Sequence, residues 1–354
     1  MPLTTIRTSN LDTTNSLLFR NRIINGNMVI DQRNAGAAVT TANSFPVDRF
    51  KIEKNSDDTF SAQQDSSAPV GFTNSTKITI TAADASIGST QYFVIDQYIE
   101  GYNVADLAWG SANAKTVTLS FWVRSSLTGT FGGSLRNSAG DRNYAFTYSI
   151  SAADTWEQKS VTIAGDTSGT WLTTNGVGIQ LAFSLGAGSS RVATAGSWGS
   201  GVILGASGQT QVISTLNATF YITGVQLEVG TAATAFERRP YGTELNLCHR
   251  YYHYLGGDTA YQSINTVVWY GTGDAVGFFR HPVEMRSTPS IAKTGTWSTL
   301  GGSGSAGNTI SGDQLGPKTV QLGCTGGSSG TSGQASTLRV SNDLNFRLTF
   351  SAEL

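Results

Sequence analysis

The chain has 354 residues, of which 13% are charged, against about 25% in an average protein. Its 23 Lys and Arg nearly balance its 24 Asp and Glu, so there is no positive field to hold a phosphate backbone, and we expect no nucleic-acid partner. The sequence contains no run of about 18 apolar residues and no basic start followed by an apolar stretch, so we expect neither membrane insertion nor a signal peptide.

Residues 1–20 are rich in Thr and Asn and contain few apolar positions. Because such a segment can bury little apolar surface, we predict an N-terminal arm that lies outside the folded domains. A frayed terminus without a function is the alternative interpretation.

From about Lys77 onward, apolar and polar residues alternate, and this period of two indicates half-buried β-strands. In Thr116–Val123, Phe121 shares one parity with other apolar residues, whereas Trp122 falls on the opposite face. The same alternation predicts strands at Tyr92–Tyr98, Tyr144–Ile150, Glu157–Ile163, Val177–Leu185 and Thr219–Leu227. Clusters of Gly, Asn, Asp and Ser separate the strands, without helical patterns, so residues 21–240 are predicted to form an antiparallel jelly-roll β-sandwich in an all-β chain.

The pattern changes at Tyr241, where we place the start of a second domain, residues 241–354. Thr243 is the predicted N-cap, and apolar residues at helical spacing predict one short amphipathic helix that reaches Leu255. Strand patterns then return at Ile264–Tyr270, Ala275–Arg280 and Thr319–Cys324. The second domain is therefore predicted to be a helix followed by a smaller C-terminal β-sandwich.

Two features mark the later part of this domain. Glycine is frequent between Gly295 and Gly333, with 12 in 39 positions, which indicates long loops between short strands. From Leu344 to Leu354 apolar and polar residues alternate without interruption, so we expect the chain to end inside a sheet.

Few residues point to chemistry. Cys248 and Cys324 lie far apart and match no metal-ligand spacing, so we expect free structural thiols rather than a disulfide. His249 and His253 have the spacing of one helix face, but the Glu of a zinc-protease motif is absent, and we interpret them as helix-surface residues. The sequence offers no nucleotide-binding loop and no definable pair of catalytic carboxylates, so we expect a protein that is not an enzyme and binds no cofactor.

Several segments resemble a family of bacteriophage virion proteins, namely tail-fibre or minor structural proteins. The segments are NRIINGNMVIDQRNAGAAVT (Asn21–Thr40), FPVDRF (Phe45–Phe50), VTLSFWVRSS (Val117–Ser126), ITGVQLEVGTAATAFERRPYGTELNLCHRYY (Ile222–Tyr252) and, more weakly, HPVEMRSTPSI (His281–Ile291). The most specific piece is Gln226, Leu227 and Glu228 with the downstream residues Thr234, Ala235, Phe236 and Glu237.

The resemblance implies a jelly roll of the carbohydrate-binding-module type in a virion appendage. It further implies a homotrimer whose N-terminal arm contacts other virion proteins, and a surface that contacts a host-cell glycan. The protein would be made in the host cytoplasm and end up in the virion.

A sugar site on such a fold needs an aromatic ring that stacks on the apolar side of a pyranose, and a few fixed polar groups. Trp122 is the first candidate, because the alternation turns it away from the core. The other candidate glycan contacts are Trp109, Trp156, Trp171, Trp198, Trp269 and Trp297. For each ring the alternative is packing against its own sandwich or, for Trp122, against the N-terminal segment or a neighbouring subunit.

We therefore expect a phage tail fibre or similar appendage subunit that mediates assembly and glycan attachment. One alternative is a polysaccharide depolymerase on the same appendage, which needs a pair of carboxylates in a cleft. Another is a ligand-free head or tail decoration protein, whose exposed tryptophans would lie in subunit contacts. Asp31, Asp48 and Asp96 are conceivable calcium ligands, but they lack the spacing of an EF-hand loop, so we assign no metal site.

Overall fold

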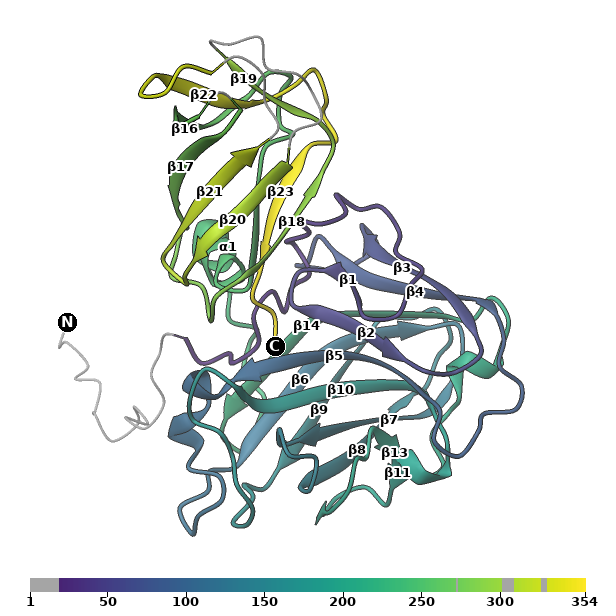
Figure 1. Cartoon of the computed structure of the whole chain (residues 1–354). Coiled ribbons are helices and arrows are strands. Elements are labelled where there is room, and N and C mark those ends of the chain that lie inside the picture. The colour runs from purple at the N-terminus through teal and green to yellow at the C-terminus, as the bar shows by residue number, and fades with distance from the viewer. Residues whose placement is uncertain (1–18, 272, 301–308, 326–329) are drawn as a thin grey trace, which may run out of the picture. The chain divides into compact units, whose positions relative to one another are not determined.

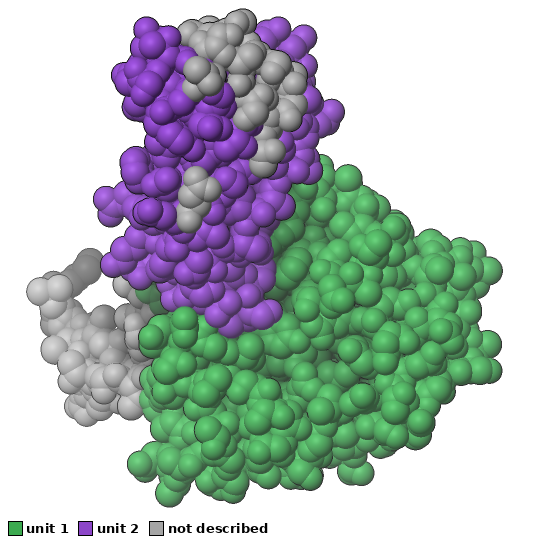
Figure 2. Space-filling model, viewed as in Figure 1, with its two compact units in different colours: residues 1–239 green, residues 240–354 purple. Residues whose placement is uncertain are grey.

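The computed structural model describes residues 19–271, 273–300, 309–325 and 330–354. The chain forms two compact units, residues 1–239 (unit 1) and residues 240–354 (unit 2), which Figure 2 shows in different colours. Regular structure is almost entirely β, and the strands pair antiparallel except for β11 with β13. The predicted arm of residues 1–20 lies outside the described residues, apart from Phe19 and Arg20.

Unit 1 is an antiparallel jelly-roll β-sandwich of two large sheets (Figure 1). The seven-stranded sheet has the order β1 (Ser44–Val47), β2 (Phe50–Lys54), β5 (Tyr92–Glu100), β10 (Val177–Ala187), β7 (Gly129–Arg136), β8 (Asn143–Ile150) and β12 (Trp198–Gly199). The five-stranded sheet has the order β3 (Thr59–Asp65), β4 (Ser75–Ala82), β14 (Thr219–Val229), β6 (Val117–Ser125) and β9 (Glu157–Ile163). The remaining elements are β11 (Val192–Ala193), β13 (Gly205–Ala206) and the 3-10 helices Gly101–Asn103, Ala105–Leu107, Ser189–Arg191 and Val212–Ser214.

The core of unit 1 lies between these two sheets and follows the alternation of the sequence. In β6, Leu119 and Phe121 are fully buried, whereas Trp122 is half-buried on the outer face. In β10, Leu181 and Phe183 enter the same core, and each buried side chain of this size contributes about 1.5–3 kcal/mol. The strands predicted from the period of two are confirmed as β5, β6, β8, β9, β10 and β14.

Unit 2 begins with the helix α1 (Tyr241–His249) and continues as a smaller β-sandwich. Its three-stranded sheet has the order β15 (Tyr252–Leu255), β23 (Arg347–Ser351) and β18 (Ser290–Thr294). Its six-stranded sheet has the order β19 (Trp297–Leu300), β22 (Ala335–Val340), β16 (Ser263–Trp269), β17 (Ala275–Arg280), β21 (Thr319–Thr325) and β20 (Thr309–Leu315). Strands thus occupy much of Gly295–Gly333, where we expected long loops, and residues 301–308 and 326–329 of that stretch lie outside the described residues.

The helix is shorter than predicted. Its N-cap is Pro240 rather than Thr243, it ends at His249, and Tyr252–Leu255 pair with β23 as a strand. A short apolar run can satisfy a helical period and a strand period at once, and pairing with a neighbouring strand decides between them. His253 therefore does not lie on a helix surface, and its side chain is 1% exposed inside unit 2.

The alternation at the end of the chain is confirmed from Phe346 to Ala352, whereas Leu344, where we expected it to begin, is 58% exposed. Phe346, Leu348 and Phe350 are fully buried in unit 2. Strand pairing stops at Ser351, so β23 ends three residues before the last residue, Leu354. Beyond the strand, the N–H of Ala352 still donates a hydrogen bond of 2.7 Å to the carbonyl of Tyr251, the residue just before β15.

Both cysteines are buried in unit 2 and no disulfide joins them, which confirms that prediction for Cys248 and Cys324. Within the described ranges, no three His, Cys, Asp or Glu side chains are grouped so that they could hold a metal ion. In the same ranges, no helix has the length and apolar character needed to cross a membrane.

Candidate functional site

Two of the seven tryptophans lie in the core of unit 2. Trp269 is 2% exposed and Trp297 is 1% exposed. A ring that is enclosed on all sides has no face on which a sugar can stack. The predicted glycan contacts at Trp269 and Trp297 are therefore wrong, because the alternation of β16 and β19 turns both rings inward.

Trp109, Trp171 and Trp198 meet in one cluster of unit 1. Their ring centroids lie 4.7, 5.2 and 5.5 Å apart, and each pair packs edge to face. The three indole N–H groups donate hydrogen bonds to the backbone carbonyls of Lys115, Ser168 and Ala164, respectively. The three rings thus pack against one another, and their N–H groups bond to the backbone of unit 1.

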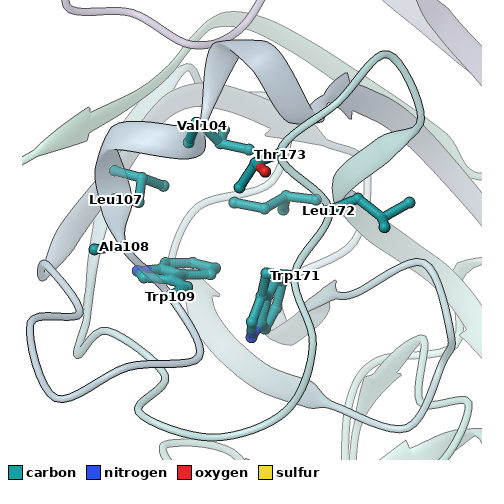
Figure 3. Close-up of a pocket in the computed structure, with 9 residues that line it drawn as sticks. Val104, Leu107, Ala108, Trp109, Trp171, Leu172 and Thr173 are labelled. Atoms are coloured by element: carbon teal, nitrogen blue, oxygen red, sulfur yellow. The ribbon is translucent and has the colours of Figure 1, made fainter.

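The cavity beside this cluster is small. It is lined by Trp109 and Trp171 together with Val104, Leu107 and Leu172 among others, and its volume is about 20 Å³ (Figure 3). A volume of that size holds about one water molecule, and a pyranose ring does not fit. The predicted glycan contacts at Trp109 and Trp171 are therefore corrected to packing residues, whereas Trp198, which is half-buried and does not line this cavity, stays a prediction.

Trp122 and Trp156 lie on the outer face of the five-stranded sheet, and both are half-buried. Trp156 immediately precedes β9 and packs edge-on against Tyr221 of β14, with ring centroids 6.0 Å apart. The guanidinium of Arg124 lies 5.0 Å from the Tyr221 ring centroid, in a cation–π contact. This face therefore carries partly open aromatic rings, as the alternation predicted for Trp122.

A groove of about 390 Å³ opens beside Trp122. It is lined by Gln158, Lys159, Ser160, Ala233, Thr234 and Ala235. Trp122 is the cross-strand partner of Gln158, which places their Cβ atoms about 5 Å apart on one face of the sheet. The volume falls within the range of small-molecule sites, about 300–1,000 Å³.

The wall of this groove is held by two buried side chains of β14. The Glu228 carboxylate accepts hydrogen bonds from the N–H (2.9 Å) and the hydroxyl (2.7 Å) of Thr234. The Gln226 amide donates to Glu228 (2.8 Å) and to the carbonyl of Ala235 (3.4 Å). Its oxygen accepts the N–H of Glu237 at 2.8 Å. Because Gln226 is 0% and Glu228 2% exposed, each depends on the other for satisfied hydrogen bonds.

The same segment is tied to the beginning of unit 1. The Glu237 carboxylate accepts the backbone N–H groups of Arg20 (3.1 Å) and Asn21 (2.9 Å). The Asn21 side chain donates to the carbonyl of Val225 (3.0 Å) and accepts the N–H of Leu227 (3.1 Å). Residues from the two ends of unit 1 thus bond to one another and fix the groove wall.

A second aromatic pair borders Trp122. Phe72 and Phe236 pack edge-on with centroids 5.2 Å apart, and the guanidinium of Arg238 lies 4.8 Å from the Phe72 ring centroid. A Cβ on Gly224 would lie 2.8 Å from Phe72 Cζ and 3.0 Å from Trp122 Cδ1. Glycine at this position therefore lets the two rings approach the strand from either side.

A polar network on the outer face of the seven-stranded sheet was not predicted. The Gln180 amide donates to Asp96 (2.7 Å) and accepts from Arg136 (2.8 Å), while the Tyr98 hydroxyl donates to Glu53 (2.9 Å). Burial, reinforced by the charge of Glu53, raises the pKa of Asp96 well above its usual value. Asp96 is fully buried and Gln180 is 1% exposed, so Asp96 and Glu53 do not face a substrate together, as the carboxylates of a glycosidase must.

No family model and no curated protein matches this chain. Among solved structures, the chain is similar to the enzymatically active domain of tailspike protein 4 from bacteriophage CBA120, at 12% identity and a TM-score of 0.32, over 60% of this chain but only 22% of that chain. It is also similar to a family 11 carbohydrate-binding module from Clostridium thermocellum, at 11% identity and a TM-score of 0.28, over 57% of this chain and 100% of the module. A third similar structure is TmCBM61 in complex with β-1,4-galactotriose. Its identity is 10% and its TM-score 0.28, and the match covers 60% of this chain and 99% of that protein. Because these TM-scores are low, the likenesses carry no argument about what this chain does.

Proposed function

We propose that unit 1 binds a host-surface glycan in the groove beside Trp122, and that the chain is a subunit of a phage virion appendage such as a tail fibre. The observation that carries the proposal is the groove of about 390 Å³ with Trp122 directly across from the lining residue Gln158. A pyranose has an apolar face that stacks on an aromatic ring, and hydroxyls that bond to amides and hydroxyls. The amide and hydroxyls line the groove, and the aromatic ring of Trp122 lies beside it as the cross-strand neighbour of Gln158.

The lining favours binding over cleavage. The six lining residues contribute an amide, two hydroxyls and an ammonium group, and none of them is a carboxylate. A glycosidase needs two carboxylates beside the scissile bond. The Lys159 ammonium is paired with Glu157 at 2.5 Å, so its charge is largely compensated, and a neutral glycan is the better fit.

The virion part of the proposal is supported by the residues that carry the family resemblance. Gln226, Glu228, Thr234 and Glu237 belong to the most specific of the matching segments, and they build or anchor the groove wall. In this proposal the N-terminal arm anchors the subunit to other virion proteins, and three copies associate through closed symmetry.

A glycan array with the full chain tests the binding. We expect neutral oligosaccharides to bind, and Trp122→Ala to weaken the best of them at least tenfold, or about 1.4 kcal/mol. Tyr102→Ala is the matched control, because Tyr102 is an aromatic residue of unit 1 that is 61% exposed and does not line the groove. If Trp122→Ala folds and binds as tightly as the unmodified chain, the proposal is wrong.

A further inference from the structure

Unit 2 exposes an aromatic ring on the outer face of its six-stranded sheet. Phe278 of β17 is 70% exposed, although burial of a Phe side chain is worth about 1.5–3 kcal/mol. Val268 of β16 is 44% exposed and pairs with Val276, which lies two residues before Phe278. The three apolar side chains therefore share one face of the sheet.

A groove of about 240 Å³ lies against this ring. It is lined by Phe278, Gln314, Leu315, Gly316, Thr319 and Gln321. Phe278 pairs with Gln321 across one strand boundary, and Gln321 pairs with Gln314 across the next. The aromatic ring and the two amides thus form one row across three neighbouring strands.

The polar groups of this row are open to a ligand. Within the described part of the chain, no hydrogen bond to the protein engages the side-chain amides of Gln314 and Gln321. None of the six lining residues is ionisable, so the groove offers donors and acceptors without a charge.

We propose that the Phe278 groove is a second saccharide site, which takes one ring of a neutral glycan. The apolar face of a pyranose stacks on Phe278, and its hydroxyls bond to the amides of Gln314 and Gln321. The site has the same ligand class as the groove beside Trp122 but shares no residue with it, so either site can fail without the other. Two sites in one chain increase the avidity for a surface that displays many copies of a glycan.

A second copy of this chain is the competing occupant. The core of a subunit interface is mostly apolar, whereas this groove places two amides and the Thr319 hydroxyl beside its two apolar side chains, Phe278 and Leu315. The lining therefore favours a ligand that is itself rich in hydroxyls.

Saturation-transfer NMR of the full chain, with lactose, maltose and cellobiose as probes, tests the site. The measurement is made on the Trp122→Ala variant, so that sugar bound in the unit 1 groove does not contribute to the signal. We expect this variant to transfer saturation to at least one disaccharide, Gln321→Ala to weaken that binding at least tenfold, and Phe278→Ala to abolish it. Tyr241→Ala, another aromatic residue of unit 2 that is 61% exposed, should leave it unchanged.

Three results would overturn the proposal. They are no saturation in the Trp122→Ala background, saturation that survives Phe278→Ala, and a smaller mass of Phe278→Ala in light scattering, which would identify a subunit contact. If Phe278→Ala alone abolishes all binding while Trp122→Ala has no effect, this site stands and the proposed function of the unit 1 groove fails.

Discussion

Gly224 sets how closely the rings of Phe72 and Trp122 approach strand β14. Its φ of +62° is unfavourable for a residue with a Cβ, and that Cβ would also press on both rings. We expect Gly224→Ala to lower the free energy of unfolding by about 1–3 kcal/mol and to weaken glycan binding, as measured by urea unfolding and by titration. Gly208 is the control, because it has a φ of +77° but no neighbour within 4 Å of an added Cβ. If Gly224→Ala and Gly208→Ala bind the glycan equally well, the placement of the Phe72 and Trp122 rings does not affect glycan binding.

His253 makes the stability of unit 2 depend on pH. Its Nε2 lies 2.8 Å from Nδ1 of His281, so one neutral ring donates and the other accepts, and its ring stacks on Phe350 with centroids 4.7 Å apart. Burial, together with the charges of His281 and His249, lowers the pKa of His253 to about 3. In the unfolded chain that pKa is about 6.5, so as the pH falls below about 6.5 the unfolded state takes up a proton that the folded state refuses.

We therefore predict that His253 alone removes about 2 kcal/mol of unfolding free energy between pH 7 and pH 5. His253→Gln keeps a donor for His281 but does not titrate. Between pH 7 and pH 5 its free energy of unfolding should therefore fall by about 2 kcal/mol less than that of the unmodified chain, as measured by denaturant unfolding. Asp48 and Asp96 of unit 1, whose pKa values burial raises, act in the opposite direction, but they are the same in both proteins and cancel. An identical pH dependence of the two proteins would contradict the prediction.

At the scale of single elements, the strands of unit 1 could be predicted because large apolar side chains on the core face alternate with polar or small residues on the other face. In β10 both faces are buried, yet Leu181 and Phe183 on the core face still alternate with Gln180 and Ser184, so the sequence records the polarity of each face and not its exposure. The apolar residues of Tyr252–Leu255 fit both a helical and a strand period, so the sequence alone predicts a helix there, and only pairing with the distant strand β23 makes the segment a strand.

The candidate site was only partly predictable from the sequence, because it depends on contacts between segments that a local period does not record. Trp122 could be placed on the outer face from its parity, but the groove depends on a loop that Gln226 and Glu228 hold through hydrogen bonds, which no periodicity records. The cluster of Trp109, Trp171 and Trp198 joins segments that are far apart in sequence, so its burial could not be predicted from any one of them.

The groove wall gives a prediction at this scale. Glu228→Ala removes the acceptor for the Thr234 N–H and hydroxyl and for the Gln226 amide, all in a buried setting. We expect a loss of about 1–3 kcal/mol in unfolding free energy, faster hydrogen exchange at Thr234–Glu237 and loss of glycan binding. Glu228→Gln, which keeps one acceptor oxygen, should be milder in all three. Unchanged exchange in Glu228→Ala would mean that other contacts hold the wall.

At the scale of the whole molecule, the proposed appendage is a homotrimer. If three copies associate through closed symmetry, as proposed, light scattering of the purified chain at several concentrations should give a mass near three times 37.3 kDa. A monomer at every concentration would contradict a trimer that forms outside the virion.

The central claim is that the groove beside Trp122 holds a glycan, and the most direct measurement is a crystal structure of the full chain with the tightest oligosaccharide from the array. We predict a sugar ring stacked on Trp122, with hydroxyls bonded to Gln158 and Ser160. Density for the sugar only elsewhere in unit 1, for example over Tyr98 and Arg136 on the seven-stranded sheet, would contradict the account.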